Sequence, residues 1–83
     1  MDRSITSDEY RRFRELLRRL RQDAGLTQVE VAERLDEPQS FVSKYESGER
    51  RLDVIETRHI AEALGTTLAE VVARLDQADG PSE

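Results

Sequence analysis

The segment from residue 26 to residue 48, LTQVEVAERLDEPQSFVSKYESG, constrains the fold of this chain more than any other. Thr27 and Glu30 fit a capping box, in which two side chains satisfy the backbone of the first helical turn. The run 36–38, Asp-Glu-Pro, ends that helix two turns later, because the residue before a proline avoids helical backbone angles. A second short helix is predicted over 39–47, before a glycine. The segment therefore predicts two short helices joined by a tight turn.

The flanking sequence predicts three more helices. A first helix is predicted between a capping box of Thr6 and Glu9 and the glycine at position 25, because apolar residues recur there at spacings of three and four. Capping boxes at Asp53 and Thr67 open a fourth and a fifth helix. No segment has the alternation of a strand. We therefore expect an all-α fold, a compact five-helix domain built around the helix-turn-helix.

The length and the ends of the chain bound its domain organisation. Eighty-three residues form one small domain with a modest core. We expect an N-terminal extension over 1–16 that continues into the first helix, and a helix-turn-helix domain over 17–72 with its motif at 28–47. Residues 76–83, DQADGPSE, contain no apolar residue larger than alanine and are expected to form a flexible acidic tail.

The composition argues against several classes of function. The chain has no cysteine and one histidine, His59, so thiolate metal sites, cysteine nucleophiles and histidine-based triads lack their members. We expect no metal, no cofactor and no enzymatic activity. No apolar run approaches the roughly 20 residues of a membrane span. The expected location is the cytoplasm, with the protein associated with the nucleoid and not with a membrane.

The third helix has one polar side and one apolar side on a wheel of about 100° per residue. The apolar side should pack inward and carries Phe41, Val42 and Tyr45. The polar side carries the candidate base-reading residues Gln39, Ser40, Ser43 and Lys44. Glutamine pairs with adenine, lysine reaches guanine, and serine adapts to donors and acceptors. The alternative is an ordinary amphipathic surface helix, but the tight turn and the caps favour a helix that enters the major groove of double-stranded DNA.

Two further groups are candidate phosphate contacts. Thr27 and Gln28 stand where a helix begins, and unpaired N–H groups there attract anions. Capping alone explains Thr27 but does not explain Gln28. Arg50 and Arg51 follow the third helix in a loop expected to lie near the DNA backbone. The alternative for these arginines is an unremarkable surface pair.

The net charge of −5 opposes a nucleic-acid partner, because such proteins usually carry a basic surface. The distribution weakens this objection. Residues 1–25 hold seven arginines against five acids, whereas residues 52–83 hold two basic residues against seven acids. We expect the acidic C-terminal part to face away from DNA. Weak non-specific binding and a modest salt dependence are predicted.

The chain resembles the Cro and phage-repressor family of helix-turn-helix proteins, also called the xenobiotic-response-element type. The resemblance covers roughly 17–72, and it is carried by LRRLRQDAGLTQVEVAERL (17–35) and FVSKYESGER (41–50). It implies that Gln28 holds a phosphate and that the polar side of the third helix reads bases. It also implies a salt bridge between Arg21 and Glu46, which would attach the third helix to the first.

Three residues depart from the family pattern. Asp36 replaces the usual glycine of the turn, where aspartate tolerates a left-handed conformation. Pro38 replaces a serine or threonine cap, so one N–H at the helix start loses a side-chain partner. Leu52 replaces a common proline, which leaves the loop before the fourth helix less defined.

These features predict a sequence-specific DNA-binding transcriptional regulator. One short helix contacts few base pairs, so we expect a homodimer on a palindromic or pseudopalindromic operator, and repression by blocking polymerase. The candidate dimer residues, which could instead simply close the core, are Leu68, Val71, Val72 and Leu75. The alternative function is an adaptor or antitoxin whose main contact is an unknown protein partner, and the acidic C-terminal half favours it.

Overall fold

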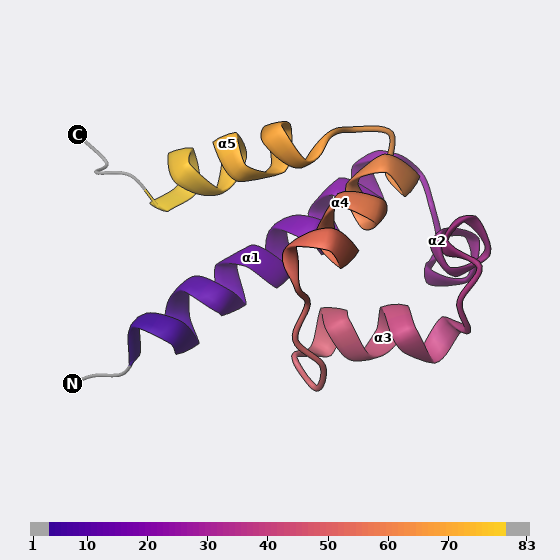
Figure 1. The fold of residues 1–83 in the computed structure, drawn as a ribbon, viewed down its shortest axis with the longest axis horizontal. Coiled ribbons are helices and arrows are strands. Elements are labelled where there is room, and N and C mark those ends of the chain that lie inside the picture. The colour runs from indigo at the N-terminus through magenta and orange to yellow at the C-terminus, as the bar shows by residue number, and fades with distance from the viewer. Residues whose placement is uncertain (1–3, 80–83) are drawn as a thin grey trace.

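The structure is a computed structural model that describes the backbone of residues 4–79 and the side chains of residues 8–77. Within these residues it contains five helices and no strand, so the predicted all-α, five-helix fold is confirmed (Figure 1). The helices are α1 (Ser4–Asp23), α2 (Gln28–Leu35), α3 (Gln39–Ser47), α4 (Val54–Ala63) and α5 (Leu68–Asp79).

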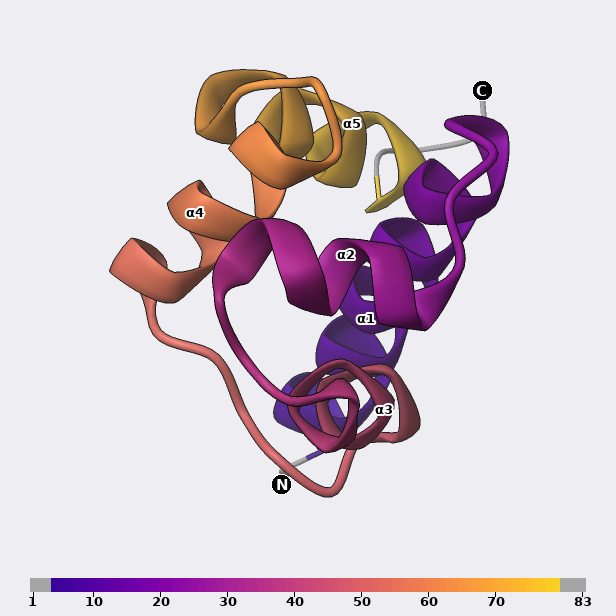
Figure 2. The same ribbon diagram turned by 90° about the vertical axis from the view of Figure 1, so that its right-hand side faces the viewer.

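The long helix α1 is the support on which the others assemble. It contacts α5 on one side and α3 on another, and these two helices lie above and below it in Figure 1. Helix α2 packs mainly on α3 and also contacts α4, which in turn contacts α5. Viewed at 90°, α2 crosses in front of α1, with α4 beside it and α3 below (Figure 2). The two helices of the motif therefore rest on a scaffold made by the other three.

The core lies where the apolar faces of all five helices meet. Its largest fully buried side chains are Leu17, Val31, Val42, Tyr45, Ile60 and Val71. Burial of such side chains contributes roughly 1.5–3 kcal/mol each, which must offset the conformational entropy of an 83-residue chain. The alternating spacings of three and four in the sequence therefore correspond to one shared core.

The turn between α2 and α3 contains one residue, Asp36, in the left-handed conformation that the sequence predicted. Asp36 has φ 58° and ψ 43°, and its N–H donates to the carbonyls of Ala32 and Glu33. Pro38 is the N-cap of α3 and makes no side-chain cap hydrogen bond. An aspartate can thus close this turn in place of glycine, because its short polar side chain tolerates the left-handed region.

Two predicted boundaries are wrong. Helix α1 begins at Ser4, so Thr6 lies inside its first turn rather than at its start. The helix can begin earlier than predicted because positions 4–6 contain no glycine or proline. Helix α5 continues to Asp79, so residues 76–79 are helical and not part of a tail. The first strong helix breakers are the glycine and proline at 80 and 81. The rest of the predicted tail, 80–83, lies outside the described residues.

Candidate nucleic-acid interface

Helix α3 turns its polar side outward. Gln39, Ser40, Ser43 and Lys44 are all exposed. Val42 and Tyr45, on the opposite side, are 0% and 1% exposed. Phe41 packs edge-on against Tyr45, with ring centroids 5.5 Å apart. The structure therefore brings the four predicted base-reading residues together on one accessible face of a helix that is anchored through its other face.

Arg21 and Glu46 attach α3 to α1. The Arg21 Nε donates to Glu46 Oε2 at 2.7 Å, and Nη2 donates to Oε1 at 3.0 Å. The two side chains are only 12% and 5% exposed. The hydrogen bond to Glu46 raises the pKa of Arg21 above its usual value, so the guanidinium stays charged. This two-pronged pair fixes orientation as well as distance.

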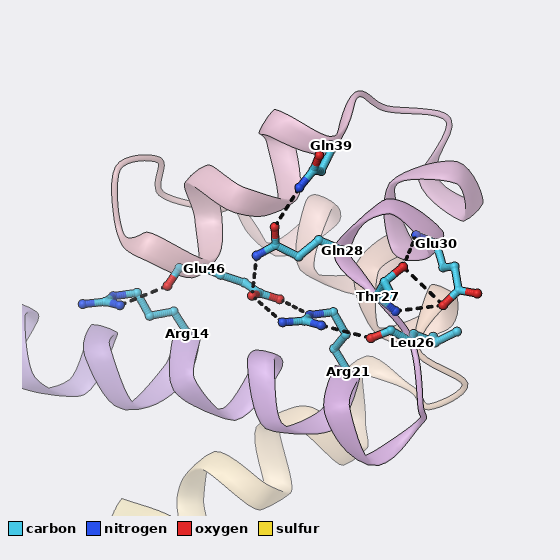
Figure 3. A network of polar contacts seen from close by, with 8 residues as sticks. All are labelled: Arg14, Arg21, Leu26, Thr27, Gln28, Glu30, Gln39 and Glu46. Carbon is cyan, nitrogen blue, oxygen red and sulfur yellow. Dashed lines mark hydrogen bonds and ion pairs between the residues drawn. The ribbon is translucent and has the colours of Figure 1, made fainter.

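A chain of amide contacts extends this ion pair to the reading face (Figure 3). The Gln28 Nε2 donates to Glu46 Oε1 at 3.0 Å, and the Gln39 Nε2 donates to Gln28 Oε1 at 3.2 Å. The second contact uses one Nε2 hydrogen of Gln39, so the other Nε2 hydrogen and the Oε1 acceptor of Gln39 remain available to a ligand. Those two groups form the donor–acceptor pair that matches the major-groove edge of adenine. Gln28, which is half-buried, thus holds a base-reading candidate in place.

Thr27 stands at the start of α2 with its cap complete. Its hydroxyl accepts from the Glu30 N–H at 3.1 Å, and its own N–H donates to the Glu30 carboxylate at 2.8 Å. The predicted capping box is present. The side chain is exposed, but the N–H of Thr27 is already used by a carboxylate.

Arg50 is engaged within the domain. Its Nη2 and Nη1 donate to the two oxygens of Glu56 at 2.7 and 3.1 Å. Its guanidinium also lies 4.8 Å from the centroid of the Phe41 ring. The hydrogen bond from Arg50 lowers the pKa of Glu56 below its usual value. The structure therefore gives Arg50 an internal partner, whereas Arg51 is exposed beside it.

The loop after α3 is held by residues that precede the expected domain start. The N–H of Leu52 donates to the Tyr10 hydroxyl at 3.0 Å, and the Arg51 guanidinium lies 4.3 Å from the centroid of the Tyr10 ring. Arg14 Nη1 donates to the Glu46 carbonyl at 3.0 Å, near the end of α3. Sequence reasoning missed Tyr10 and Arg14 as contacts of this loop. Arg14 and Arg21 are seven residues apart, the spacing of one helix face, and that spacing was an available signal.

The four dimer candidates do not share one environment. Val71 is 1% exposed and belongs to the core, so it is not available to a partner, and its prediction as an interface residue is wrong. Its side chain faces inward because α5 must cover α1 and α4. Leu68 and Leu75 are half-buried, and Val72 is 47% exposed. Only the outer edge of this set remains accessible.

Metal-binding clusters and membrane-spanning helices are both absent from the part of the chain that the structure describes. Across residues 4–79, no group of three or more histidine, cysteine, aspartate or glutamate side chains could hold a metal ion. No helix in that range is long and apolar enough to cross a membrane.

Comparison with known proteins agrees with this geometry. Residues 17–71 match the family described as Helix-turn-helix. The chain is 41% identical over 59 residues to an uncharacterized HTH-type transcriptional regulator, y4dJ, of Sinorhizobium fredii, and the match covers 71% of this chain and 77% of that protein. A solved XRE-family like protein from Pseudomonas syringae pv. tomato superposes with a TM-score of 0.86 at 44% identity, covering 94% of each chain. The chain therefore belongs to the Cro and phage-repressor, or xenobiotic-response-element, family of helix-turn-helix DNA-binding transcriptional regulators.

Proposed function

We propose that this protein is a sequence-specific repressor that reads its operator with the exposed side of α3. The base-reading residues are Gln39, Ser40, Ser43 and Lys44. The observation that carries the proposal is the chain of contacts from Arg21 through Glu46 and Gln28 to Gln39. A side chain held in this way loses less conformational entropy when it meets a base edge than a free one would.

The phosphate contacts are proposed at both ends of the motif. Thr27 and Gln28 lie at the N-terminus of α2, and Gln28 keeps one Nε2 hydrogen beyond its contacts with Glu46 and Gln39. Arg51 lies after α3 and is exposed. Arg50 is not retained as a phosphate contact, because its guanidinium is paired with Glu56. These contacts would position the domain on the duplex and would not by themselves select a sequence.

The active species in this proposal is a homodimer on a palindromic or pseudopalindromic operator. A single α3 reads only a few base pairs, so two half-sites about one helical turn apart are needed for affinity. The dimer contact is proposed at Val72, with the exposed edges of Leu68 and Leu75. Bound in this way at the nucleoid, in the cytoplasm, the dimer blocks polymerase by occupying the DNA and needs no catalytic step.

Substitution of Gln39 tests the reading role. Operators are first selected from a random oligonucleotide pool, and binding is then measured by fluorescence anisotropy. Gln39→Ala is expected to lose about 1–3 kcal/mol on the selected operator and little on random duplex, because only base contacts distinguish the two. Gln22→Ala, an exposed glutamine on α1, is the matched control and should change neither. Equal losses on both DNAs would exclude base reading by Gln39.

A second candidate function is an adaptor or antitoxin that acts mainly through a protein partner. The net charge of −5, concentrated toward the C-terminus, favours it. A salt titration on random duplex DNA separates the two candidates. A DNA reader weakens as salt rises, whereas an adaptor shows no binding even at low salt.

A further inference from the structure

A groove lies where α2, α3 and α4 meet, away from the reading face. Its volume is about 530 Å³, and its apolar lining comes from Leu35, Phe41, Ile55, Ile60 and Ala63. This size is typical of sites that hold several aliphatic side chains or a small molecule.

The polar lining of the groove is predominantly acidic. Glu37, Asp53 and Glu62 line it and are exposed. Glu56 also lines it but is paired with Arg50, and Glu62 makes a longer ion pair with Arg58 at 3.7 Å. His59 also lines the groove and is exposed. The groove has one arginine, Arg34, and that guanidinium donates to the backbone carbonyl of Ala63 at 2.8 Å. The groove therefore combines an apolar floor with a rim that attracts cations and repels DNA.

Two apolar side chains in the first turn of α4 are highly exposed beside this groove. Ile55, one wall of the groove, is 57% exposed, and the neighbouring Val54 is 61% exposed. They account for two of the four large exposed apolar residues among those with described side chains. Exposed apolar surface ringed by charge is typical of a protein-binding site.

The groove and the reading face can be occupied together. Phe41 enters the groove from the inward side of α3, at least about 60° around the helix from any of the four reading residues, on a wheel of about 100° per residue. In Figure 2, α4 and α2 lie above α3, which is near the lower edge of the molecule. A ligand in the groove would thus contact a different face of the protein from the one proposed to contact DNA.

We propose that this groove binds a short amphipathic helix of a partner protein, with aliphatic side chains on one face and lysine or arginine along its margins. The aliphatic side chains would cover Leu35, Phe41 and Ile55, and the cations would lie against Glu37 and Glu62. This is recognition of a helix in a groove, in which apolar anchors supply affinity and the charged rim selects the sign of the partner. The proposal is independent of whether DNA is bound.

The test uses the full chain and two synthetic helical peptides of about 15 residues, a length at which helices begin to persist. One peptide has leucines on one face and lysines elsewhere, and the other has glutamate at every lysine position. Backbone amide shifts followed by NMR should move around residues 35, 37, 55, 59 and 62 with the lysine peptide only. The expected dissociation constant is on the order of 100 µM.

Three variants locate the binding. Ile55→Ser is expected to weaken the lysine peptide about tenfold, and Glu62→Lys to weaken it about threefold, because each removes one of the two attractions. Val29→Ser is the matched control, because Val29 is an exposed apolar residue outside the groove. Its dissociation constant for the lysine peptide should stay within about twofold of the parent value. Operator binding by Ile55→Ser should be unchanged, so a failure of the groove proposal is separable from a failure of DNA reading.

Three outcomes would overturn the proposal. The first is no shift with the lysine peptide at millimolar concentration. The second is equal binding of both peptides, which would mean that apolar contact alone acts without the acidic rim. The third is a loss of self-association by Ile55→Ser in sedimentation, which would identify a second copy of this chain as the occupant.

Discussion

At the residue scale, Glu46 joins three parts of the molecule. Its carboxylate accepts from Arg21 of α1 and Gln28 of α2, and its carbonyl accepts from Arg14. Transfer of a carboxylate from water into an interior costs several kcal/mol, and paired charges with further hydrogen bonds offset it. The carboxylate is 5% exposed, so its partners are needed to keep it there.

Removal of Arg21 should therefore destabilise the domain strongly. Arg21→Ala is expected to cost about 3–5 kcal/mol in the free energy of unfolding, measured by urea denaturation, because Glu46 is left buried and unpaired. Arg21→Lys keeps the charge but not the two-pronged geometry, so it should lose less free energy of unfolding than Arg21→Ala. It can therefore be measured in place of Arg21→Ala if the alanine variant fails to fold. Arg58→Ala removes an exposed pair with Glu62 and should cost under about 1 kcal/mol. Similar small losses from all three variants would argue against a structural role for the buried pair.

Glu56 predicts one part of the acid response. Its folded-state pKa is lowered, first by the hydrogen bond from Arg50. Its stabilisation is therefore fully present above the usual carboxylate pKa of about 4.3, and it is lost as the pH falls through the lower folded value.

Thermal melts across pH compare Glu56→Gln with the parent chain. The variant should be less stable near neutral pH, and the difference should shrink below about pH 4. Glu33→Gln, an exposed glutamate on α2, is the control and should follow the parent throughout. A difference for Glu56→Gln that is constant with pH would contradict the role of this ion pair.

At the scale of elements, the N-terminal half of α1 supports the end of α3. Arg14 lies so close to Gly48 that a Cβ there would come within 2.9 Å of its Nε. Gly48 also has φ 91°, a conformation that costs residues with a side chain about 1–2 kcal/mol. The glycine thus ends α3 and admits the arginine that caps it.

A double-mutant cycle separates these two requirements. Gly65→Ala is the matched control, since Gly65 has φ 84° but nothing within 4 Å of an added Cβ. Gly48→Ala is expected to exceed the cost of Gly65→Ala by about 1 kcal/mol, because it also displaces a hydrogen-bonded arginine. In an Arg14→Ala background the excess should vanish, as measured by urea denaturation. An excess that survives would show that the two residues are independent.

The elements were largely predictable from the sequence, and their cross-contacts were not. Capping boxes and apolar spacing are local signals, so they predicted α2, α3 and α4 closely. The resemblance to a family supplied the Arg21–Glu46 pair, which is present. Arg50 and Glu56 meet across a loop, where no helical register indicates a contact, so the sequence did not predict this ion pair. Burial of Val71 was also left open, because one face of α5 could serve a core or a partner.

At the scale of the whole molecule, the small size of the core favours association with a second copy of the chain. A chain of 83 residues has limited apolar surface to bury, and a second copy would add to it. Val72 is the most exposed large apolar residue of α5. The proposed dimer would cover it and would present two copies of α3 to successive turns of one DNA face.

Sedimentation equilibrium tests this assembly. The parent chain is expected to be a dimer at micromolar concentration, and Val72→Lys a monomer with operator affinity lowered at least about tenfold, since half-sites no longer bind together. Val54→Lys places the same charge at an exposed valine of α4 and should remain dimeric. A monomeric parent chain, or a dimeric Val72→Lys, would exclude this interface.

The hydrogen-bond chain that ends at Gln39 begins on the first helix, at the buried side chain of Arg21. In the proposed function, a substitution beside the buried pair that keeps the pair but shifts Gln28 alters which operators are preferred, while every proposed DNA-contacting residue stays the same. With Gln39 as the proposed base reader, operator preference depends partly on residues inside the domain, and it can change without replacement of a contact residue.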